Sequence, residues 1–272
     1  MKNIKSYSGD DLAFHKSIVS NSLNKGVSQD NLLKNEHIIT SKYADYKVKF
    51  DNNDLLSINA HGFDGEDKTN LLKLYSSQRK PIIELKKELT TNEFNQRNND
   101  CPNCTIEKVA SLDHYIPKDE FPEFSVNPIN LIPCCSTCNS KKKEKWKGDQ
   151  NLLFINLYSD VIPIVQYLFV DIVSKTEFKF ELKNINNIDI DLFKIIESHY
   201  SKLDLPQRFK ENSDEVISEL DLIISSFKDS ISANNVLLDV VKKHYSKIEA
   251  TKGINNWKIV LVKAMINSNI YF

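Results

Sequence analysis

Two CxxC pairs carry the clearest chemistry in the sequence: Cys101 with Cys104, and Cys135 with Cys138. Zn²⁺ prefers four soft or borderline ligands in a tetrahedron, and each CxxC turn directs two sulfur atoms at one point. Residues 105–134 separate the pairs, a longer gap than the roughly 15 to 20 residues of a simple zinc ribbon. The spacing therefore predicts a structural zinc site with folded structure inside the gap.

Three other interpretations of the cysteines stay open from sequence alone. In the first, some of them are buried thiols without a metal. In the second, Cys134 replaces Cys135 as a ligand, although the CxxC spacing favours Cys135 and leaves Cys134 as a small buried residue. In the third, Cys101-Pro102-Asn103-Cys104 is a thioredoxin-like redox turn, which needs a preceding strand and a following helix. The polar lead-in Asn98-Asn99-Asp100 argues against the third.

An adjacent carboxylate and imidazole, Asp113 and His114, lie inside the gap. A carboxylate is a hard ligand that suits Mg²⁺ or Mn²⁺, and a neutral imidazole can take a proton from a water molecule that attacks a phosphodiester. Successive side chains of a strand point to opposite faces, so a regular strand would separate the two residues unless the chain bends there. Pro117 supports such a bend.

A cluster of lysines surrounds Trp146 after the last cysteine: Lys141, Lys142, Lys143, Lys145 and Lys147. The whole chain is nearly neutral, with 36 basic and 37 acidic residues, so this cluster would be a local electrostatic footprint for a phosphate backbone. The alternative is a solvated surface. We expect Asp119, Glu120 and Glu123 in the preceding loop to face solvent or a partner, because they would repel a phosphate.

The order of these segments resembles the HNH endonucleases, of the ββα-metal or His-Me finger type with a zinc-bearing frame. The first CxxC pair is followed by Leu112-Asp113-His114, then by Asn130-Leu131-Ile132-Pro133, and finally by Cys135-Ser136-Thr137-Cys138-Asn139 and the lysines. The resemblance covers residues 101–147 and neither flank. It implies metal-dependent hydrolysis of DNA phosphodiester bonds.

The resemblance also implies a role for each signature position. His114 matches the general base, and Asp113 matches a ligand of the catalytic divalent ion. Asn130 matches the asparagine that braces the loop and orients the base. Asn139 matches the second ligand, where many relatives have histidine, and its hard amide oxygen suits Mg²⁺ or Mn²⁺. Lys142 stands where the family has a phosphate-contacting lysine.

A short hairpin and a helix must position these groups. We expect one strand over Val109–Tyr115, a proline-bearing loop over Pro117–Pro128, a second strand over Ile129–Pro133 and a helix that begins near Ser136. Three apolar side chains would anchor the loop against this module: Phe121, Pro122 and Phe124. The predicted fold class is α+β and mainly helical, with a ββα-metal HNH core between helical flanks.

The N-terminal flank is predicted to be mainly helical. Ser8-Gly9-Asp10 can cap a first helix, which Gly26 would end, and Ser28 would start a second one. Tyr43–Phe50 alternates weakly between apolar and polar residues, as a strand would. Pro81 suits the first turn of a further helix.

The C-terminal flank is predicted to hold a hairpin and several helices. The apolar runs Ile162–Val173 and Phe178–Leu182 are rich in β-branched and aromatic residues and favour the hairpin. Apolar stripes at helical spacing then predict helices that bury core residues, at 192–203, 216–231, 237–248 and 257–265. Pro206 would close the first of them, and Asn255 or Asn256 would cap the last.

Three regions follow: a mainly helical region over residues 1–90, the HNH core over 91–150, and a hairpin with helices over 151–272. The N-terminus has no apolar leader, and no stretch approaches the roughly 18 consecutive apolar residues of a membrane span. We therefore expect a cytoplasmic protein without a membrane partner. Two CxxC pairs in a reducing cytosol indicate metal binding more readily than disulfides.

We therefore expect an enzyme, a metal-dependent HNH endonuclease that cleaves DNA with a structural Zn²⁺ and a catalytic Mg²⁺ or Mn²⁺. Four side chains of the lysine cluster would bind the DNA: Lys141, Lys142, Lys143 and Lys145. The helical flanks lack an obvious sequence-reading module, so a protein partner such as a defence ATPase would direct the nuclease in anti-phage defence or restriction. The alternative is a non-catalytic, zinc-stabilised adaptor that binds nucleic acid or another protein.

Overall fold

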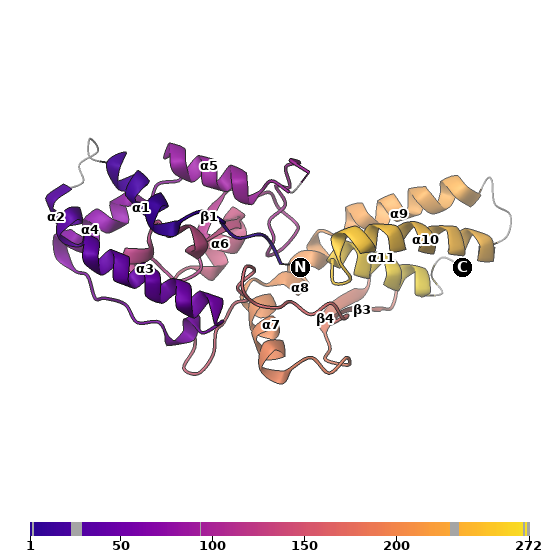
Figure 1. Ribbon diagram of the computed structural model, residues 1–272. Coiled ribbons are helices and arrows are strands. Elements are labelled where there is room, and N and C mark those ends of the chain that lie inside the picture. Colours follow the sequence, from indigo (N-terminus) through magenta and orange to yellow (C-terminus); the bar gives the residue numbers. More distant parts are fainter. Residues whose placement is uncertain (2, 23–28, 93, 229–233, 269, 271–272) are drawn as a thin grey trace. The chain divides into compact units, whose positions relative to one another are not determined.

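The computed structural model describes residues 1, 3–22, 29–92, 94–228, 234–268 and 270 (Figure 1). Helices dominate these residues, and two two-stranded antiparallel sheets lie among them. The predicted fold class, α+β and mainly helical, is confirmed. The chain forms two compact units, one mainly from Asn3–Asn103 and Glu107–Val161, the other mainly from Ile162–Phe272. The division into three regions stays a prediction.

The described residues of the N-terminal flank form these helices: α1 Asp11–Ser20, α2 Gln29–Lys34, α3 Glu36–Asp51, α4 Gly65–Leu74 and α5 Lys80–Leu89. The side chain of Asp10 accepts a hydrogen bond of 2.7 Å from the amide of Ala13, so the predicted cap of α1 is confirmed. Pro81 lies in the first turn of α5, where its missing N–H costs no intrahelical bond. The predicted boundaries at Gly26 and Ser28 lie outside the described residues.

The strand predicted over Tyr43–Phe50 is wrong, because these residues continue α3. The buried positions of α3 are Ile39, Tyr43 and Tyr46, and their spacing of four and three puts them on one helical face. Val48 is 59 % exposed, so the apparent alternation does not mark a buried strand face. A short 3₁₀ turn, η1 Leu55–Ser57, follows α3.

The hairpin and helix predicted around the signature residues are confirmed. β1 Ser111–His114 pairs antiparallel with β2 Leu131–Cys134, and α6 Ser136–Lys142 follows. The connection between the strands contains two 3₁₀ turns, η2 Pro122–Phe124 and η3 Pro128–Asn130. η2 packs against α3 and α4, and η3 contacts α1. The N-terminal helices therefore hold the loop between the two strands (Figure 1).

The second unit contains the predicted hairpin and helices: β3 Leu168–Ile172, β4 Phe178–Leu182, α7 Ile190–Lys202, α8 Leu205–Glu211, α9 Ser213–Lys228, α10 Asn234–Lys252 and α11 Trp257–Asn267. α9, α10 and α11 pack side by side, and α11 also contacts β3 (Figure 1). Asn256 caps α11 by accepting from the amide of Ile259, as predicted. Pro206 lies in the first turn of α8 and does not itself end α7. None of the helices in the described part of the chain is long and apolar enough to cross a membrane.

Candidate functional site

The four sulfur atoms of the CxxC pairs converge. The Sγ atoms of Cys101, Cys104, Cys135 and Cys138 lie within 4.8 Å of one another, and all four residues are buried. Zn–S bonds of about 2.3 Å place the sulfur atoms of a tetrahedral site about 4 Å apart, which is close to this spacing. The cluster is thus positioned to hold one metal ion.

Backbone amides point at the sulfur atoms of this cluster. The amide of Cys135 donates to Cys101 Sγ at 3.3 Å. The amide of Ile106 donates to Cys104 Sγ at 3.4 Å. Cys135 also caps α6, since its Sγ accepts from the amide of Cys138 at 3.3 Å. Such donors stabilise the negative charge of metal-bound thiolates, so the donor set fits a structural Zn²⁺.

Cys134 is not one of the four converging residues, although its thiol lies in hydrogen-bond contact with Cys101 and Cys138. Its side chain is buried, and Asn103 Nδ2 donates to its Sγ at 3.5 Å. Cys134 is therefore the small buried residue expected from the spacing, and Cys135 is the candidate ligand. The redox-turn interpretation is wrong, because a series of turns and bends follows Cys101–Cys104 where that interpretation needs a helix.

His114, the last residue of β1, is held by its Nε2 atom. Nε2 lies 2.8 Å from the backbone oxygen of Ser125. Since a carbonyl oxygen only accepts, Nε2 carries the proton and Nδ1 keeps its lone pair. Burial lowers the pKa of His114 to about 3, so the ring is neutral near pH 7. Among the described residues Nδ1 has no hydrogen-bond partner, so its lone pair is unused. A neutral imidazole with an unused lone pair can act as a general base.

Asp113 is buried beside a lysine of α6. Its Oδ2 lies 3.4 Å from Lys142 Nζ, which also donates to the backbone oxygen of His114 at 2.6 Å. Burial raises the pKa of Asp113, and the positive charge of Lys142 acts in the opposite direction. The ammonium group of Lys142 therefore forms a buried ion pair with this carboxylate.

Asn139 faces the same side of β1 as Asp113. Its Nδ2 donates to Ser111 Oγ at 3.4 Å, and Ser111 and Asp113 share one face of the strand because side chains alternate. The carboxylate and the amide oxygen of these two residues are hard donors. Mg²⁺ commonly keeps several waters and takes few protein ligands, and a site for Mg²⁺ or Mn²⁺ at this pair stays a prediction.

Asn130 forms the central brace of the loop between the strands. Its Oδ1 accepts from the amide of Ile116 at 2.8 Å and from Tyr46 Oη at 3.1 Å. Its Nδ2 donates to the backbone oxygens of Ile116 at 2.9 Å and Phe124 at 3.4 Å. The side chain is completely buried, and it ties both ends of the loop to α3. This geometry matches the bracing role that the resemblance implies.

α4 and the residue that follows it supply contacts to His114 that the sequence reasoning missed. Tyr75 ends α4, and its ring packs edge-on against His114 with 4.5 Å between the ring centroids. Its Oη donates to the backbone oxygen of Leu112 at 2.5 Å. Ser125, whose backbone oxygen contacts His114, donates its own Oγ to the backbone oxygen of Leu71 at 2.7 Å. No motif spacing links α4 to His114, so only the three-dimensional arrangement identifies Tyr75.

The predicted DNA-binding lysines separate into two groups. Lys141, Lys143 and Lys145 are exposed, as a DNA-binding surface requires. Lys142 is 7 % exposed and points inward at Asp113. The exposed lysines on and after α6 thus form the positive surface, while Lys142 is buried beside Asp113.

The loop that carries the acidic residues is only partly exposed. Asp119 and Glu120 face solvent as expected. The same expectation is wrong for Glu123, which is fully buried and accepts from the amide of His61 at 2.7 Å. Phe121 and Phe124 are buried too, so the predicted anchoring of the loop is confirmed.

Comparison with known proteins gives two partial similarities. The chain is 28 % identical to Protein ea31 of Escherichia phage lambda over 198 residues, which cover 63 % of each protein. It is 40 % identical to Septu protein PtuB of Bacillus thuringiensis over 50 residues, which cover 16 % of this chain and 20 % of that protein. The chain thus spans less than two thirds of either relative. No protein-family model and no solved structure matches it.

Proposed function

We propose that the chain is a metal-dependent endonuclease of the HNH type that hydrolyses DNA phosphodiester bonds. The observation that carries this proposal is the state of His114 beside Asp113. A buried, neutral imidazole has its Nε2 proton committed to Ser125 and its Nδ1 lone pair open, next to a buried carboxylate. This combination suits hydrolysis by an activated water.

In the proposed reaction, His114 Nδ1 removes a proton from the water that attacks the phosphorus atom. The Ser125 oxygen keeps the ring oriented and stabilises the imidazolium that forms. Asp113 and Asn139 would hold the divalent ion, which supplies charge stabilisation to the phosphate and the leaving oxygen when bound. Asn130 keeps the loop that carries Ser125 in place.

Electrostatics supports DNA as the substrate. Lys141, Lys143 and Lys145 are exposed on or just after α6, the helix that also carries Asn139. A backbone that these lysines attract would lie beside the proposed metal ligands. Neutralisation of phosphates by lysine releases counterions and is the main source of non-specific DNA affinity.

Cleavage of supercoiled plasmid tests this proposal. We expect nicking or linearisation that requires added Mg²⁺ or Mn²⁺ and is lost in Asp113→Ala and in His114→Ala, while both variants keep their zinc and their unfolding transition. Tight DNA binding without any nicking in Mg²⁺, Mn²⁺ or Ni²⁺ would instead support the zinc-stabilised adaptor.

We further propose that the nuclease serves anti-phage defence or restriction with a protein partner such as a defence ATPase. The partial similarity to Septu protein PtuB supports this setting. Copurification of the full chain from its native host tests it. An ATPase that elutes with the parent protein is the expected result, and a chain that elutes alone from cells under phage challenge would contradict it.

A further inference from the structure

A pocket beside the zinc frame is lined by five residues: Lys86, Arg97, Asn99, Lys108 and Val109. Its cationic side chains come from three segments that the sequence keeps apart. Lys86 belongs to α5. Arg97 forms a backbone β-bridge with Thr91 in the turn after α5. Lys108 forms a second backbone β-bridge, with Asp100, across the first CxxC turn. The fold therefore brings three positively charged side chains together in one pocket.

Most of this charge is not neutralised within the protein. Lys86 Nζ donates to the backbone oxygen of Ala110 at 3.1 Å, and Arg97 donates to Asn99 Oδ1 at 3.3 Å, both neutral acceptors. Lys108 pairs with Asp100 at 2.6 Å, but its side chain is 77 % exposed and this surface pair is weak. Within the described ranges, Lys86 and Arg97 form no ion pair. The pocket thus offers net positive charge and several N–H donors.

The pocket is connected to the candidate site through β1. Lys86 contacts Ala110, and the next residue, Ser111, contacts Asn139. From Ala110 to Asp113 an extended chain spans about 10 Å at about 3.3 Å per residue. A DNA strand carries one phosphate for about every 3.4 Å of helix axis, so one strand that runs along β1 can place phosphates at both ends of this span.

We propose that this pocket binds a DNA backbone phosphate a few nucleotides from the scissile bond. The proposal rests on the proposed nuclease function for its substrate. It assigns phosphate contacts to Lys86, Arg97 and Lys108, outside the lysine cluster that follows the last cysteine. Guanidinium and ammonium groups that converge on one concave place suit a phosphate, which accepts several hydrogen bonds at once.

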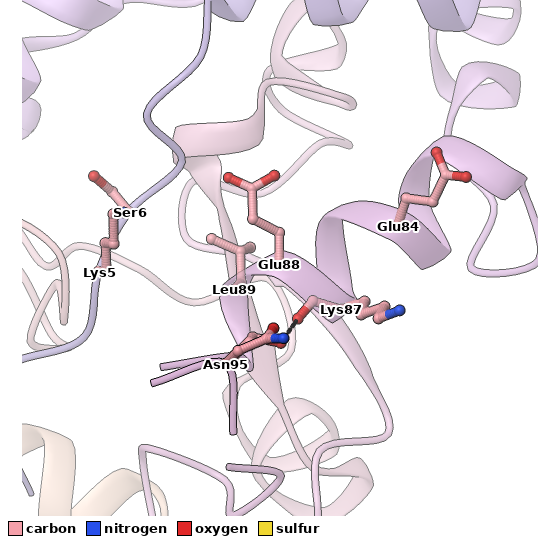
Figure 2. A pocket seen from close by; sticks show the side chains of 8 residues that line it. Lys5, Ser6, Glu84, Lys87, Glu88, Leu89 and Asn95 are labelled. Carbon is pink, nitrogen blue, oxygen red and sulfur yellow. Dashed lines mark hydrogen bonds between the residues drawn. The ribbon is translucent and has the colours of Figure 1, made fainter. Parts of the chain in front are cut away.

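A second pocket on α5 contains both acidic and basic side chains. It is lined on α5 by Glu84, Lys87 and Glu88, and by Lys5 and Ser6 of the N-terminal segment (Figure 2). The two carboxylates in it would repel a phosphate. Lys87 is exposed, follows Lys86 directly and lines only this mixed pocket, which makes it a matched control.

Salt-dependent DNA binding tests the proposal. Fluorescence anisotropy of a labelled DNA duplex, without added Mg²⁺ or Mn²⁺, is compared for the parent chain, the triple variant Lys86→Gln/Arg97→Gln/Lys108→Gln and the control Lys87→Gln. Each phosphate that is no longer neutralised reduces the magnitude of the slope of log K against log salt by about 0.9, so the triple variant, which loses the one phosphate of the pocket, is expected to lose about 0.9. The control keeps the parent slope.

The double variant Arg97→Gln/Lys108→Gln changes only exposed side chains and is expected to reduce the magnitude of the slope by up to about 0.9. It keeps the test valid if Lys86→Gln disturbs folding. The proposal that the pocket binds phosphate is rejected if these variants show the same salt slope as the parent chain. It is also rejected if the parent chain does not bind the duplex. Plasmid cleavage by the parent together with unchanged binding in the variants rejects the pocket and keeps the nuclease. The expected loss of slope without any cleavage by the parent keeps the phosphate pocket and rejects the nuclease.

Discussion

At one end of the β1–β2 hairpin, every candidate zinc ligand lies between Cys101 and Cys138, and the amides that support the sulfur atoms come from the same stretch. At the other end, the support comes from distant helices. Tyr75 of α4 packs on His114, and Tyr46 of α3 donates to Asn130. The metal frame is thus local in sequence, whereas the geometry of the proposed base depends on the N-terminal helices.

This difference separates two kinds of damage. Loss of a cysteine should remove the scaffold that both ends share. Loss of a contact from α3 or α4 should leave the zinc in place and change only stability or the placement of His114. Zinc content measured beside stability or activity therefore distinguishes the two ends.

The largest effect is expected for Cys138→Ser, which removes one of the four zinc ligands. Structural zinc contributes about 10 to 16 kcal/mol of apparent binding free energy in small zinc domains, so this variant should lose its zinc and its cooperative unfolding transition. Elemental analysis and thermal denaturation measure both. Cys134→Ala is the matched control and should keep one zinc per chain, whereas zinc loss from it would place Cys134 in the site.

Asn130→Ala should have the next largest effect, at the other end of the hairpin. It removes the side chain that joins Ile116, Phe124 and Tyr46 and leaves buried polar groups without partners. We expect the free energy of unfolding to fall by about 3 kcal/mol, measured by urea denaturation, with zinc retained. Tyr46→Phe removes one of these bonds and should cost about 1 kcal/mol. Equal costs for both variants would show that Asn130 is not the brace.

Mild acid should loosen the N-terminal helices through His15. This residue of α1 is buried against Tyr43 of α3 at 3.1 Å, and burial lowers its pKa from 6.5 to about 4. The unfolded chain therefore takes up the proton first, and stability falls as pH drops from about 6.5 towards 4, on the order of 3 kcal/mol in total. His15→Gln should lack this part of the pH dependence. If the free energy of unfolding falls with pH equally in the parent and in His15→Gln, His15 does not contribute to the acid sensitivity.

Tyr75→Phe should have the smallest effect. It keeps the ring on His114 and removes the hydroxyl bond to Leu112, a loss of about 1 kcal/mol. If that bond positions the base, the rate of plasmid cleavage should fall about fivefold at unchanged zinc content and unchanged substrate affinity. Tyr75→Leu also removes the ring and should slow cleavage further. A Tyr75→Leu rate equal to that of the parent would show that α4 does not position the base.

Local signals predicted the frame of the site. CxxC spacing identified the four cysteines, and the proline-bounded runs identified both strands around Asp113 and Asn130. The errors arise where tertiary packing decides. Tyr43 and Tyr46 form a helical stripe because they pack against Phe124 in the loop that holds His114, which weak alternation did not reveal. Lys142 lies in a run of lysines and Glu123 in a loop with other acidic residues, and only the folded chain shows that both turn inward.

Contacts between segments that are distant in the sequence could not be predicted from it. Tyr75 resembles any aromatic residue at the end of a helix until its ring is seen on His114. The phosphate pocket unites Lys86, Arg97 and Lys108, which share no motif. Spacing identifies ligands that one short stretch supplies, but it cannot identify groups that converge from separate elements.

The central claim is that His114 is the general base of a metal-dependent DNA hydrolysis. Its most direct test is the single-turnover rate of plasmid cleavage by His114→Ala and by the parent chain, at saturating Mg²⁺ or Mn²⁺ and equal zinc content. A general base contributes about 10² to 10⁴ in rate, and a loss of that size is expected. Equal rates of cleavage by the two proteins would contradict the claim.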